Sequence, residues 1–364
     1  MAGLYIHIPF CKKKCPYCSF YSIENYDIDV IKKYLNSLLL ELNSEVTDQS
    51  IDTIYVGGGT PSIIPIVSFE SLLIHLRHLI NFSNITEFTV EINPESATED
   101  LIKLFHNYGV NRISLGVQSF DNDVLYFLGR IHTSHMIFKT IDTIMKHYDL
   151  ENVSIDLIYD IPLVSTKKIF LSLEDAVKLG FLHISAYNYS LENNYLQHFY
   201  SAYNEQITHT INYLEKFGYE QYEISNFCRY NKISLHNIKY WLMDEYIGIG
   251  ASAHSMFNVT NGRLRRENVN NIYSYIKDPF ANRLIHNIDL KELIKEDIIF
   301  GLRYLKGINI YNYIKLPCFD KIYNEIDKLI YENLIYKCNY TINLTKKGVL
   351  FYDLVASRLW NSYA

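Results

Sequence analysis

Three cysteines stand within eight residues near the start of the chain, directly after the short apolar segment Leu4–Ile8. They are Cys11, Cys15 and Cys18 in the sequence CKKKCPYC. Zinc sites usually close with four ligands in paired knuckles, and a ferredoxin cluster needs a fourth cysteine. Neither pattern accompanies these three residues. Three thiolates on one short loop suit a [4Fe–4S] cluster, so the spacing predicts a cluster with one iron open to a small molecule.

Two other interpretations of the cysteines stay open from spacing alone. Cys15 and Cys18 form a CxxC pair of the redox type, and the three thiols could also be unrelated surface residues. The third cysteine four positions earlier and the glycine-rich segment Gly57–Gly59 downstream favour the cluster. The remaining cysteines are scattered singly, which argues against a disulfide scaffold and for a reducing compartment.

Composition sets broad limits on the fold and the partners. The chain has 364 residues and 48% hydrophobic content, enough for one large α/β domain and a smaller one. A net charge of −6 gives no reason to expect nucleic acid or an anionic membrane as a bulk partner. No signal-like start and no run of the ~20 apolar residues that a membrane span needs are present, so we expect a cytoplasmic protein.

Short β-rich segments alternate with amphipathic helical stretches over the first half of the chain. This alternation is typical of βα units, and right-handed crossovers would curl six units into a partial (β/α)6 TIM-like barrel. An open doubly wound sheet is the alternative architecture. The predicted strands are Leu4–Ile8, Thr53–Val56, Glu87–Ile92, Arg112–Val117, Ser154–Tyr159 and His183–Tyr187.

The pattern divides the chain into three parts. Residues 1–190 are expected to form the barrel, 191–285 a connecting region and 286–364 a C-terminal winged-helix-like domain. Basic and acidic residues are nearly balanced in the last part, which favours a packing or docking module over a DNA-binding one. Its predicted elements are the helices Asp289–Tyr304 and Lys321–Glu332, a strand pair within Leu334–Leu344 and a last helix Lys346–Leu359.

Polar residues follow the predicted strands. The cysteine loop comes after the first strand, Gly57–Gly59 after the second, and Gln118 after the fourth. In a barrel the carboxyl ends of parallel strands meet at one mouth, so we expect these segments to converge. Glu91 and Asp156 lie within otherwise apolar strands, where an unpaired carboxylate is costly, and this favours a functional role for both.

Several longer blocks carry a family resemblance. The chain resembles the radical SAM superfamily, and within it the HemW branch of the oxygen-independent coproporphyrinogen oxidase-like family. The resemblance implies a [4Fe–4S] cluster on the three cysteines and S-adenosylmethionine at the barrel mouth. The blocks, in order, are YIHIPFCKKKCPYCSF, GGGTPS, EINPES, GVQSF, IDLIYDIP, YEISNF, HNIKYW and GIGASAHS.

The resemblance also implies which residues contact S-adenosylmethionine. Glycine permits close approach of the backbone, an arginine suits a carboxylate, and an acidic side chain suits ribose hydroxyls. Some positions have simpler alternatives: Tyr5 and Tyr17 as core aromatics, and Arg130 as half of a surface ion pair. The implied contacts are Tyr5, Tyr17, Gly58, Gly59, Thr60, Glu91, Gln118, Arg130, Asp156 and Ala186.

Two further features separate the branches of this family. Family members that decarboxylate coproporphyrinogen III have another cysteine two positions after the third cluster cysteine, where this chain has Phe20. The motif HNIKYW, residues 236–241, matches the haem-binding HemW branch. On a helix His236 and Tyr240 share one face, and we expect only His236 to bind haem iron. Tyr240 and Trp241 would then pack on the ring or bind a propionate. The alternative is an ordinary helix with a satisfied histidine and a core tryptophan.

The resemblance therefore predicts a haem chaperone that binds the cluster, S-adenosylmethionine and haem, and passes haem to an acceptor such as a respiratory haem protein near the membrane. The first alternative is an oxygen-independent coproporphyrinogen III dehydrogenase that makes protoporphyrinogen IX. A weaker one is a cluster-dependent regulator that acts on DNA through the C-terminal module. Phe20 and HNIKYW favour the chaperone over the dehydrogenase. Whether the protein also has enzymatic turnover stays open. The family resemblance also favours a homodimer.

Overall fold

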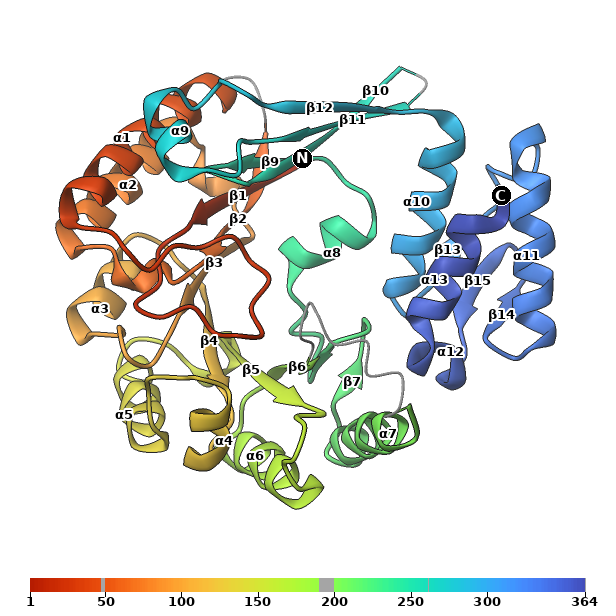
Figure 1. Cartoon of the computed structure of the whole chain (residues 1–364), viewed down its shortest axis with the longest axis horizontal. Helices are drawn as coiled ribbons and strands as arrows, with labels where there is room; N and C mark the ends of the chain where they lie inside the picture. The colour runs from red at the N-terminus through yellow and green to blue at the C-terminus, as the bar shows by residue number, and fades with distance from the viewer. Residues whose placement is uncertain (47–49, 190–199, 261, 364) are drawn as a thin grey trace.

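The computed structural model describes residues 1–46, 50–189, 200–260 and 262–363. Its main feature is a twelve-stranded sheet in the order β12-β11-β10-β9-β1-β2-β3-β4-β5-β6-β8-β7. The sheet curves around a central space, and helices cover its outer side (Figure 1). The six strands of the barrel are β1 Ala2–Ile8, β2 Ile51–Gly58, β3 Glu87–Ile92, β4 Arg112–Gln118, β5 Val153–Tyr159 and β6 His183–Asn188.

Helices connect these six strands. They are α1 Ile28–Glu45, α2 Ile66–Leu79, α3 Glu99–Asn107, α4 Asn122–Phe127, α5 Ser134–Ile144 and α6 Thr166–Leu179. Each of the strands β1 to β5 pairs in parallel with the next one along the chain, so the six strands are parallel and in sequence order. A doubly wound sheet would instead reverse its order at a central strand. The uninterrupted order confirms the partial barrel, which stays open because no pairing joins β1 to β6 within the described residues.

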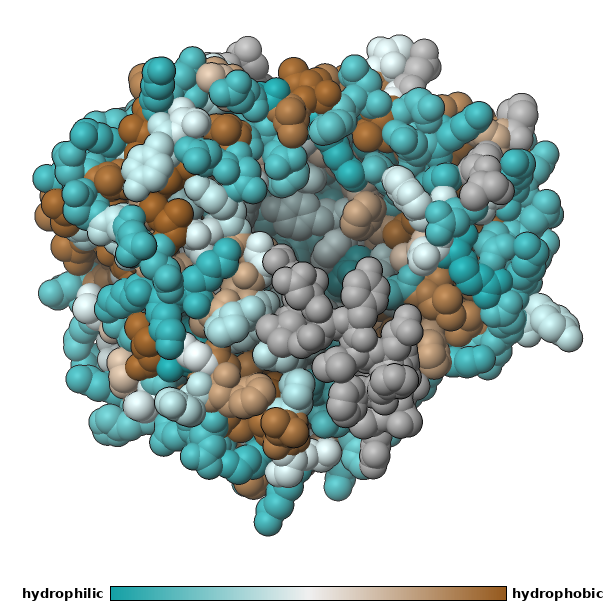
Figure 2. Space-filling view, in the orientation of Figure 1, coloured by the Kyte–Doolittle hydropathy of each residue, from teal (hydrophilic) through white to brown (hydrophobic). Residues whose placement is uncertain are grey.

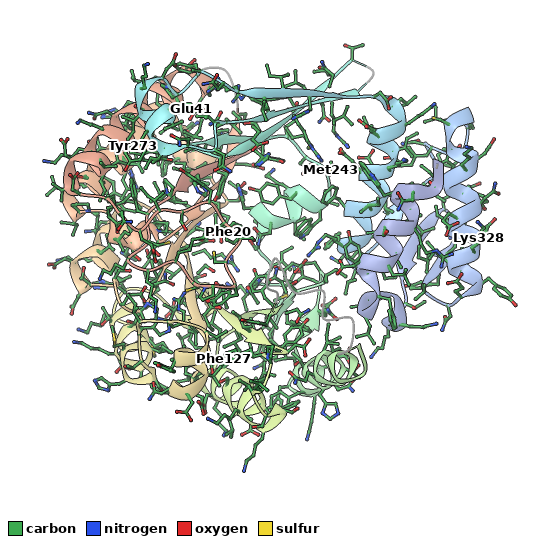
Figure 3. The ribbon with its side chains drawn as sticks, in the orientation of Figure 1. Phe20, Glu41, Phe127, Met243, Tyr273 and Lys328 are labelled. Atoms are coloured by element: carbon green, nitrogen blue, oxygen red, sulfur yellow. The ribbon has the colours of Figure 1, made fainter. Side chains whose placement is uncertain are left out.

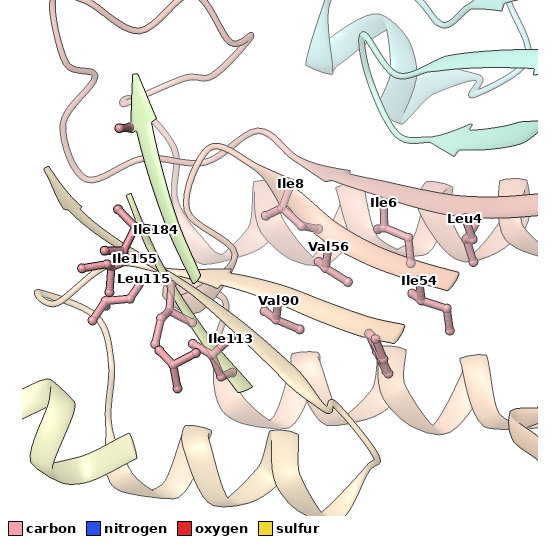
Figure 4. Close-up of a cluster of buried hydrophobic side chains, with 14 of the residues drawn as sticks. Leu4, Ile6, Ile8, Ile54, Val56, Val90, Ile113, Leu115, Ile155 and Ile184 are labelled. Carbon is pink, nitrogen blue, oxygen red and sulfur yellow. The ribbon is translucent and has the colours of Figure 1, made fainter. Parts of the chain in front are cut away.

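Strand alternation gives the barrel two different faces. Leu4, Ile6 and Ile8 of β1 are fully buried and pack with apolar side chains of the neighbouring strands and the outer helices. Figure 4 shows this layer crossing the sheet. Because successive side chains point to opposite faces, Tyr5 and His7 face the central space instead. The core is therefore on the helix side, and the inner face is left for polar side chains.

Residues after the barrel extend the sheet at both ends. β9 Tyr246–Ile249 pairs in parallel with β1, and the antiparallel strands β10 His254–Val259, β11 Gly262–Glu267 and β12 Leu284–Ile288 follow it. The other end carries β8 Asn226–Cys228 and β7 Glu220–Gln221. The expected domain boundary at residue 285 falls inside β12, and the division into three domains stays a prediction. The helices of this region are α7 Tyr200–Lys216, α8 Leu235–Trp241 and α9 Ile272–Lys277.

The C-terminal part contains helices and a three-stranded antiparallel sheet of β13 Ile308–Asn309, β15 Thr341–Leu344 and β14 Ile335–Cys338. This is the expected winged-helix-like arrangement. The predicted last helix is in fact two, because Phe351 leaves helical geometry at φ −113° and ψ 29°. The helices are α10 Leu290–Arg303, α11 Asp320–Tyr331, α12 Lys346–Leu350 and α13 Tyr352–Trp360. No helix in the described part of the chain is long and apolar enough to cross a membrane.

Candidate functional site

A cavity of about 850 Å³ lies inside the barrel, between the cysteine loop and α8. Figure 2 shows the molecule hollowed at this place. Most of the residues singled out from the sequence line it, although they come from eight separate segments of the chain. Those that line it are Tyr5, Cys11, Cys15, Tyr17, Cys18, Gly58, Gly59, Thr60, Glu91, Gln118, Arg130, Asp156, His236, Tyr240 and Trp241.

Ala186 is the exception. Its side chain is 3% exposed and packs in the apolar core with Leu157 and Ile169, on the helix side of the sheet. The neighbours of Ala186 in β6 belong to the opposite face, and one of them, Tyr187, lines the cavity. Strand alternation thus turns the Ala186 side chain away from the cavity, so a contact with a ligand there would use the Ala186 backbone, and the expected role of Ala186 stays a prediction.

The cysteine loop rests on the glycine segment after β2. Gly59 N–H donates to the carbonyl of Ile8 (2.8 Å), and Thr60 N–H donates to that of Phe10 (2.7 Å). A Cβ on Gly59 would stand 2.7 Å from the Phe10 carbonyl oxygen, so only glycine allows this approach. The glycine segment therefore braces the loop that holds the thiols, in addition to any approach to a ligand.

The three thiols have the chemistry of cluster ligands. Cys11 and Cys15 are buried, Cys18 is half-buried, and all three are free. Burial raises the pKa of the Cys11 and Cys18 thiols. A metal that replaces the proton removes this cost, because it neutralises the thiolate. No three His, Cys, Asp or Glu side chains of the described residues converge to hold one metal ion. Ligands of a cubane bind separate irons, so a cluster does not require the three thiols to converge on one ion.

Arg130 connects the cysteine loop to the barrel. Its guanidinium donates to Cys15 Sγ (3.6 Å), Asn93 Oδ1 (2.7 Å) and the Gly116 carbonyl (3.2 Å). It is therefore part of the cavity wall and not of a surface ion pair. Thr60 Oγ1 donates to Cys11 Sγ at 3.8 Å. Both contacts place hydrogen-bond donors on sulfurs that carry negative charge as iron ligands.

Glu91 is held at the end of β3 by two donors. Tyr55 Oη donates to Oε1 (2.6 Å), and Gly58 N–H donates to Oε2 (3.1 Å). Burial, reinforced by the nearby Asp156 carboxylate, raises the pKa of Glu91 to about 7 despite these hydrogen bonds. Burial likewise raises the pKa of Asp156 to about 6. Two such carboxylates facing a cavity are ready partners for hydroxyl or ammonium groups of a ligand.

Tyr5 also has a defined polar role. Its hydroxyl lies 2.8 Å from His7 Nδ1, and His7 Nε2 lies 2.9 Å from the Tyr21 carbonyl oxygen. A carbonyl only accepts, so Nε2 carries the proton and Nδ1 accepts from Tyr5. Burial lowers the pKa of His7 to about 4, which keeps the ring neutral.

At the end of β4, Gln118 has φ 65°, a left-handed conformation that is uncommon for this residue type.

Sequence reasoning missed two residues of the site. Tyr55 and Glu87 belong to none of the sequence blocks that carry the resemblance. Glu87 is 4% exposed and accepts the backbone N–H groups of Leu235 (2.6 Å) and His236 (3.2 Å). It thereby caps the first turn of α8 from β3, across about 150 residues of sequence. Period-2 alternation within β3 places Glu87, like Glu91, on the inner face, and this signal could have found it.

α8 carries the HNIKYW motif into the central space (Figure 1). His236 is 1% exposed; Nδ1 lies 2.9 Å from Thr53 Oγ1, and Nε2 lies 2.9 Å from Tyr240 Oη. Burial lowers the pKa of His236 to about 3. The imidazole stacks on Tyr55, with ring centroids 5.3 Å apart. Both ring nitrogens are thus engaged, so iron coordination through Nε2 requires the Tyr240 hydroxyl to move.

Trp241 joins α8 to the C-terminal helix α10. Its ring stacks on Phe300 at 6.3 Å with an interplanar angle of 13°, and the Arg303 guanidinium lies 4.2 Å from the ring centroid. Arg303 also forms an ion pair with Glu223, and both line the cavity. We call Cys11, Cys15, Cys18, Thr60, Glu91 and Arg130 the cysteine wall, and Glu223, Asn226, His236, Tyr240, Trp241 and Arg303 the α8 wall.

Between the walls lies Phe20, which is 61% exposed and lines the cavity. Figure 3 places it at the edge of the central space, between the cysteine loop and α8. The thiol expected of the decarboxylating relatives would occupy this place. An apolar aromatic side chain therefore stands where the resemblance predicts a cysteine in the decarboxylating members.

An open barrel with three cysteines after its first strand is the arrangement of radical SAM proteins, and the model of the radical SAM superfamily matches residues 5–169. The heme chaperone HemW of Lactococcus lactis is 33% identical over 94% of this chain and 93% of its own length. The heme chaperone HemW of Escherichia coli is 30% identical over 96% of this chain and 95% of its own. The chain belongs to the HemW family of radical SAM proteins.

A solved structure extends the comparison to the whole fold. Coproporphyrinogen III oxidase of Escherichia coli, a radical SAM enzyme, superimposes with a TM-score of 0.82 over 98% of this chain and 89% of its own. The two sequences are 21% identical, so this likeness concerns the fold. Membership of the radical SAM superfamily implies a [4Fe–4S] cluster and S-adenosylmethionine, which the cysteine wall suits by its thiols and donors.

Proposed function

We propose that this protein is a haem chaperone that binds a [4Fe–4S] cluster, S-adenosylmethionine and haem, and transfers haem to an acceptor haem protein, with the cytoplasm as its place of action. The observation that carries the proposal is the position of the HNIKYW helix. His236 and Tyr240 lie in the same cavity as the three cysteines. The proposal also rests on relatives named as heme chaperones along nearly the whole chain.

The cysteine wall would hold the cluster and S-adenosylmethionine. Cys11, Cys15 and Cys18 supply three thiolates, and the cluster with S-adenosylmethionine supplies one-electron chemistry when both are bound. Arg130 and Thr60 donate hydrogen bonds to two of the sulfurs. Glu91 and the remaining contacts inferred from the family would orient the nucleotide and the methionine end, Ala186 by its backbone alone.

The α8 wall would hold haem. His236 is the proposed iron ligand through Nε2, while its Nδ1–H donates to Thr53 and so orients the imidazole. Tyr240 occupies Nε2 in the absence of a ligand and has to swing away. Trp241 lies against α10, so we propose contact with the edge of the macrocycle and not stacking of the whole ring.

A coproporphyrinogen III dehydrogenase is the second candidate, because a protein with that activity shares the fold. Phe20 speaks against it, since a phenyl ring cannot replace a thiol in proton or hydrogen-atom transfer. The acceptor protein and a cluster-linked homodimer follow from the family alone. A respiratory haem protein near the membrane is the acceptor class that we propose.

The test uses protein reconstituted with iron and sulfide without oxygen. Haem is titrated and followed by its Soret absorption, and turnover of coproporphyrinogen III is assayed with S-adenosylmethionine and a reductant. We expect stoichiometric haem binding, loss of this binding in His236→Ala, and no decarboxylation. Tyr240→Phe is the matched variant, because it removes the hydroxyl on Nε2 and keeps the ring; its haem affinity should equal or exceed that of the wild type. Robust decarboxylation would overturn the chaperone proposal.

A further inference from the structure

Three polar groups on the α8 wall have no partner in the part of the chain that the structure describes. They are Asn226 Oδ1, Trp241 Nε1 and Arg303 Nε, which are buried and have no hydrogen-bond partner among the described residues. All three residues line the cavity. Buried donors and acceptors in folded proteins are nearly always paired, and an unpaired group costs free energy. Three on one side of one cavity therefore point to a polar group that comes from outside the chain.

These residues form one cluster although they come from different elements. The Arg303 guanidinium of α10 covers the Trp241 ring of α8 at 4.2 Å. Arg303 also pairs with Glu223, which lies between β7 and β8, and Asn226 in β8 hydrogen-bonds with Glu223. The C-terminal module thus supplies a cation to a cavity whose other lining residues come from the barrel and from the region that follows it.

The ion pair with Glu223 does not use the full capacity of Arg303. The closest N–O distance is 3.4 Å, whereas charge-assisted pairs of this kind usually measure about 2.7–2.9 Å. Other arginines of this protein reach that range: Arg283 contacts Glu41 at 2.5 Å and Arg266 contacts Glu45 at 2.8 Å. The Arg303–Glu223 ion pair is thus the longest arginine–carboxylate pair among the described residues. The guanidinium can therefore accept a second carboxylate in its fork.

We propose that Arg303 and Trp241 form a subsite that binds a carboxylate of the ligand in the cavity. The ligand class is a flat macrocycle that carries carboxylate arms, such as a porphyrin with propionates. Arg303 donates from its guanidinium, and Trp241 Nε1–H is the second donor. Asn226 Oδ1 suits a protonated carboxyl or a bridging water. The inference deepens the haem-binding proposal and rests on it, and it gives the C-terminal module a part in ligand recognition.

Glu223 competes with this carboxylate for Arg303. It is 1% exposed, and burial raises its pKa, so a second anion nearby favours its protonated form. Loss of the Glu223 charge should release Arg303 for the ligand. Substitution of Arg303 should therefore lower the affinity for the ligand, and substitution of Glu223 should raise it. Destabilisation of the protein alone would not produce these opposite effects.

The experiment measures equilibrium binding of haemin, haemin dimethyl ester and metal-free protoporphyrin IX by absorption and by quenching of tryptophan fluorescence. The ester lacks free carboxylates, and protoporphyrin IX lacks iron. Arg303→Gln should lower the affinity for haemin and protoporphyrin IX by about ten- to a hundredfold and leave the affinity for the ester unchanged. Arg303→Lys should lose less affinity than Arg303→Gln, and Glu223→Gln should bind both free acids more tightly. His236→Ala should lower the affinity for haemin alone.

Arg229→Gln is the matched control, because Arg229 stacks on Tyr219 and Tyr230 and does not line the cavity. Its affinities should equal those of the wild type, and thermal unfolding confirms that each variant is folded. Equal affinity of the wild type and Arg303→Gln for haemin and protoporphyrin IX would overturn the subsite while haem binding stands. If the wild type does not bind haemin, the proposed function is overturned. If it binds neither haemin nor protoporphyrin IX, the subsite is overturned too.

Discussion

The two walls of the cavity are built in different ways. The cysteine wall collects side chains from the carboxyl ends of consecutive parallel strands and from the loops after them, and its members Thr60, Glu91 and Arg130 each have a hydrogen-bond partner. The α8 wall collects side chains from two helices and a strand edge that are far apart in the sequence, and three of its polar groups have no partner among the described residues. A wall with internal partners is ready for a fixed cofactor, whereas one with free donors suits a ligand that comes and goes.

The difference also concerns how each wall is anchored. The cysteine loop begins at β1 and is braced by backbone hydrogen bonds from Gly59 and Thr60, so it belongs to the sheet. α8 has seven residues, too few for a helix that is stable alone. It depends on Glu87 at its N-terminus and on α10 along its side. We therefore expect α8 to respond to single substitutions more readily than the cysteine wall.

The largest effect should come from a cluster cysteine. Cys15→Ala removes one of three thiolates, and two cannot hold a site-differentiated cluster, so the reconstituted protein should lose its iron–sulfur absorption and iron content almost completely. The polypeptide should stay folded, because its sheet does not depend on Cys15. Cys228→Ala is the control on the other side of the cavity: a buried thiol near α8 whose loss should leave the iron content unchanged. Equal loss of iron in both variants would contradict the division into two walls.

Glu87→Ala tests the anchor of α8. It leaves the N–H groups of Leu235 and His236 without an acceptor in a buried place, which should lower the free energy of unfolding by about 2–4 kcal/mol. Haem binding should fall, while the iron content should stay near that of the wild type. Urea unfolding and iron analysis measure both effects. Glu70→Ala, which removes an acceptor from the partly buried Tyr108 hydroxyl, should change stability far less.

A loss of iron in Glu87→Ala equal to that in Cys15→Ala would show that the two walls fold as one unit. The comparison would then lose its basis, since the α8 wall could not move independently of the cluster. Unchanged haem binding in Glu87→Ala would instead show that α8 is held by α10 alone.

The same contrast explains what the sequence could predict. Strand periodicity gave six strands whose bounds differ from the observed ones by at most two residues at either end, because each strand buries one face against helices. The convergence of Cys11, Glu91 and Asp156 followed from the barrel rule that strand ends meet. The resemblance gave the position of Ala186 on the sixth strand and not the face on which its side chain lies, and the structure places that side chain in the apolar core.

The α8 wall was only partly predictable. The HNIKYW motif predicted a helix with His236 and Tyr240 on one face, and their hydrogen bond agrees with that spacing. Glu87 and Arg303 come from segments that carry no motif, and the block YEISNF that contains Asn226 says nothing of its partners. Their roles depend on how α10 and β8 pack against α8. Such contacts arise from tertiary packing, which local periodicity does not encode.

The smallest effect should be the pH dependence of stability, which has opposite signs in the two walls. Burial raises the pKa of Glu91 to about 7, above its value in an unfolded chain. Its contribution is present below the unfolded pKa of about 4.3 and is lost as the pH rises through 7. Burial lowers the pKa of His236 to about 3, so its contribution is present above about 6.5 and is lost as the pH falls toward 3.

Two variants separate these contributions in the cofactor-free protein. Between pH 5 and pH 7.5, Glu91→Gln should remove a decline in the free energy of unfolding of about 2–3 kcal/mol. His236→Gln should remove a rise of similar order over the same interval, because the neutral amide cannot bind the proton that the unfolded histidine takes up. Urea unfolding at both pH values measures each slope against the wild type. No change of slope in either variant would mean that its group keeps its ordinary pKa in the folded protein, and the electrostatic contrast between the walls would fail.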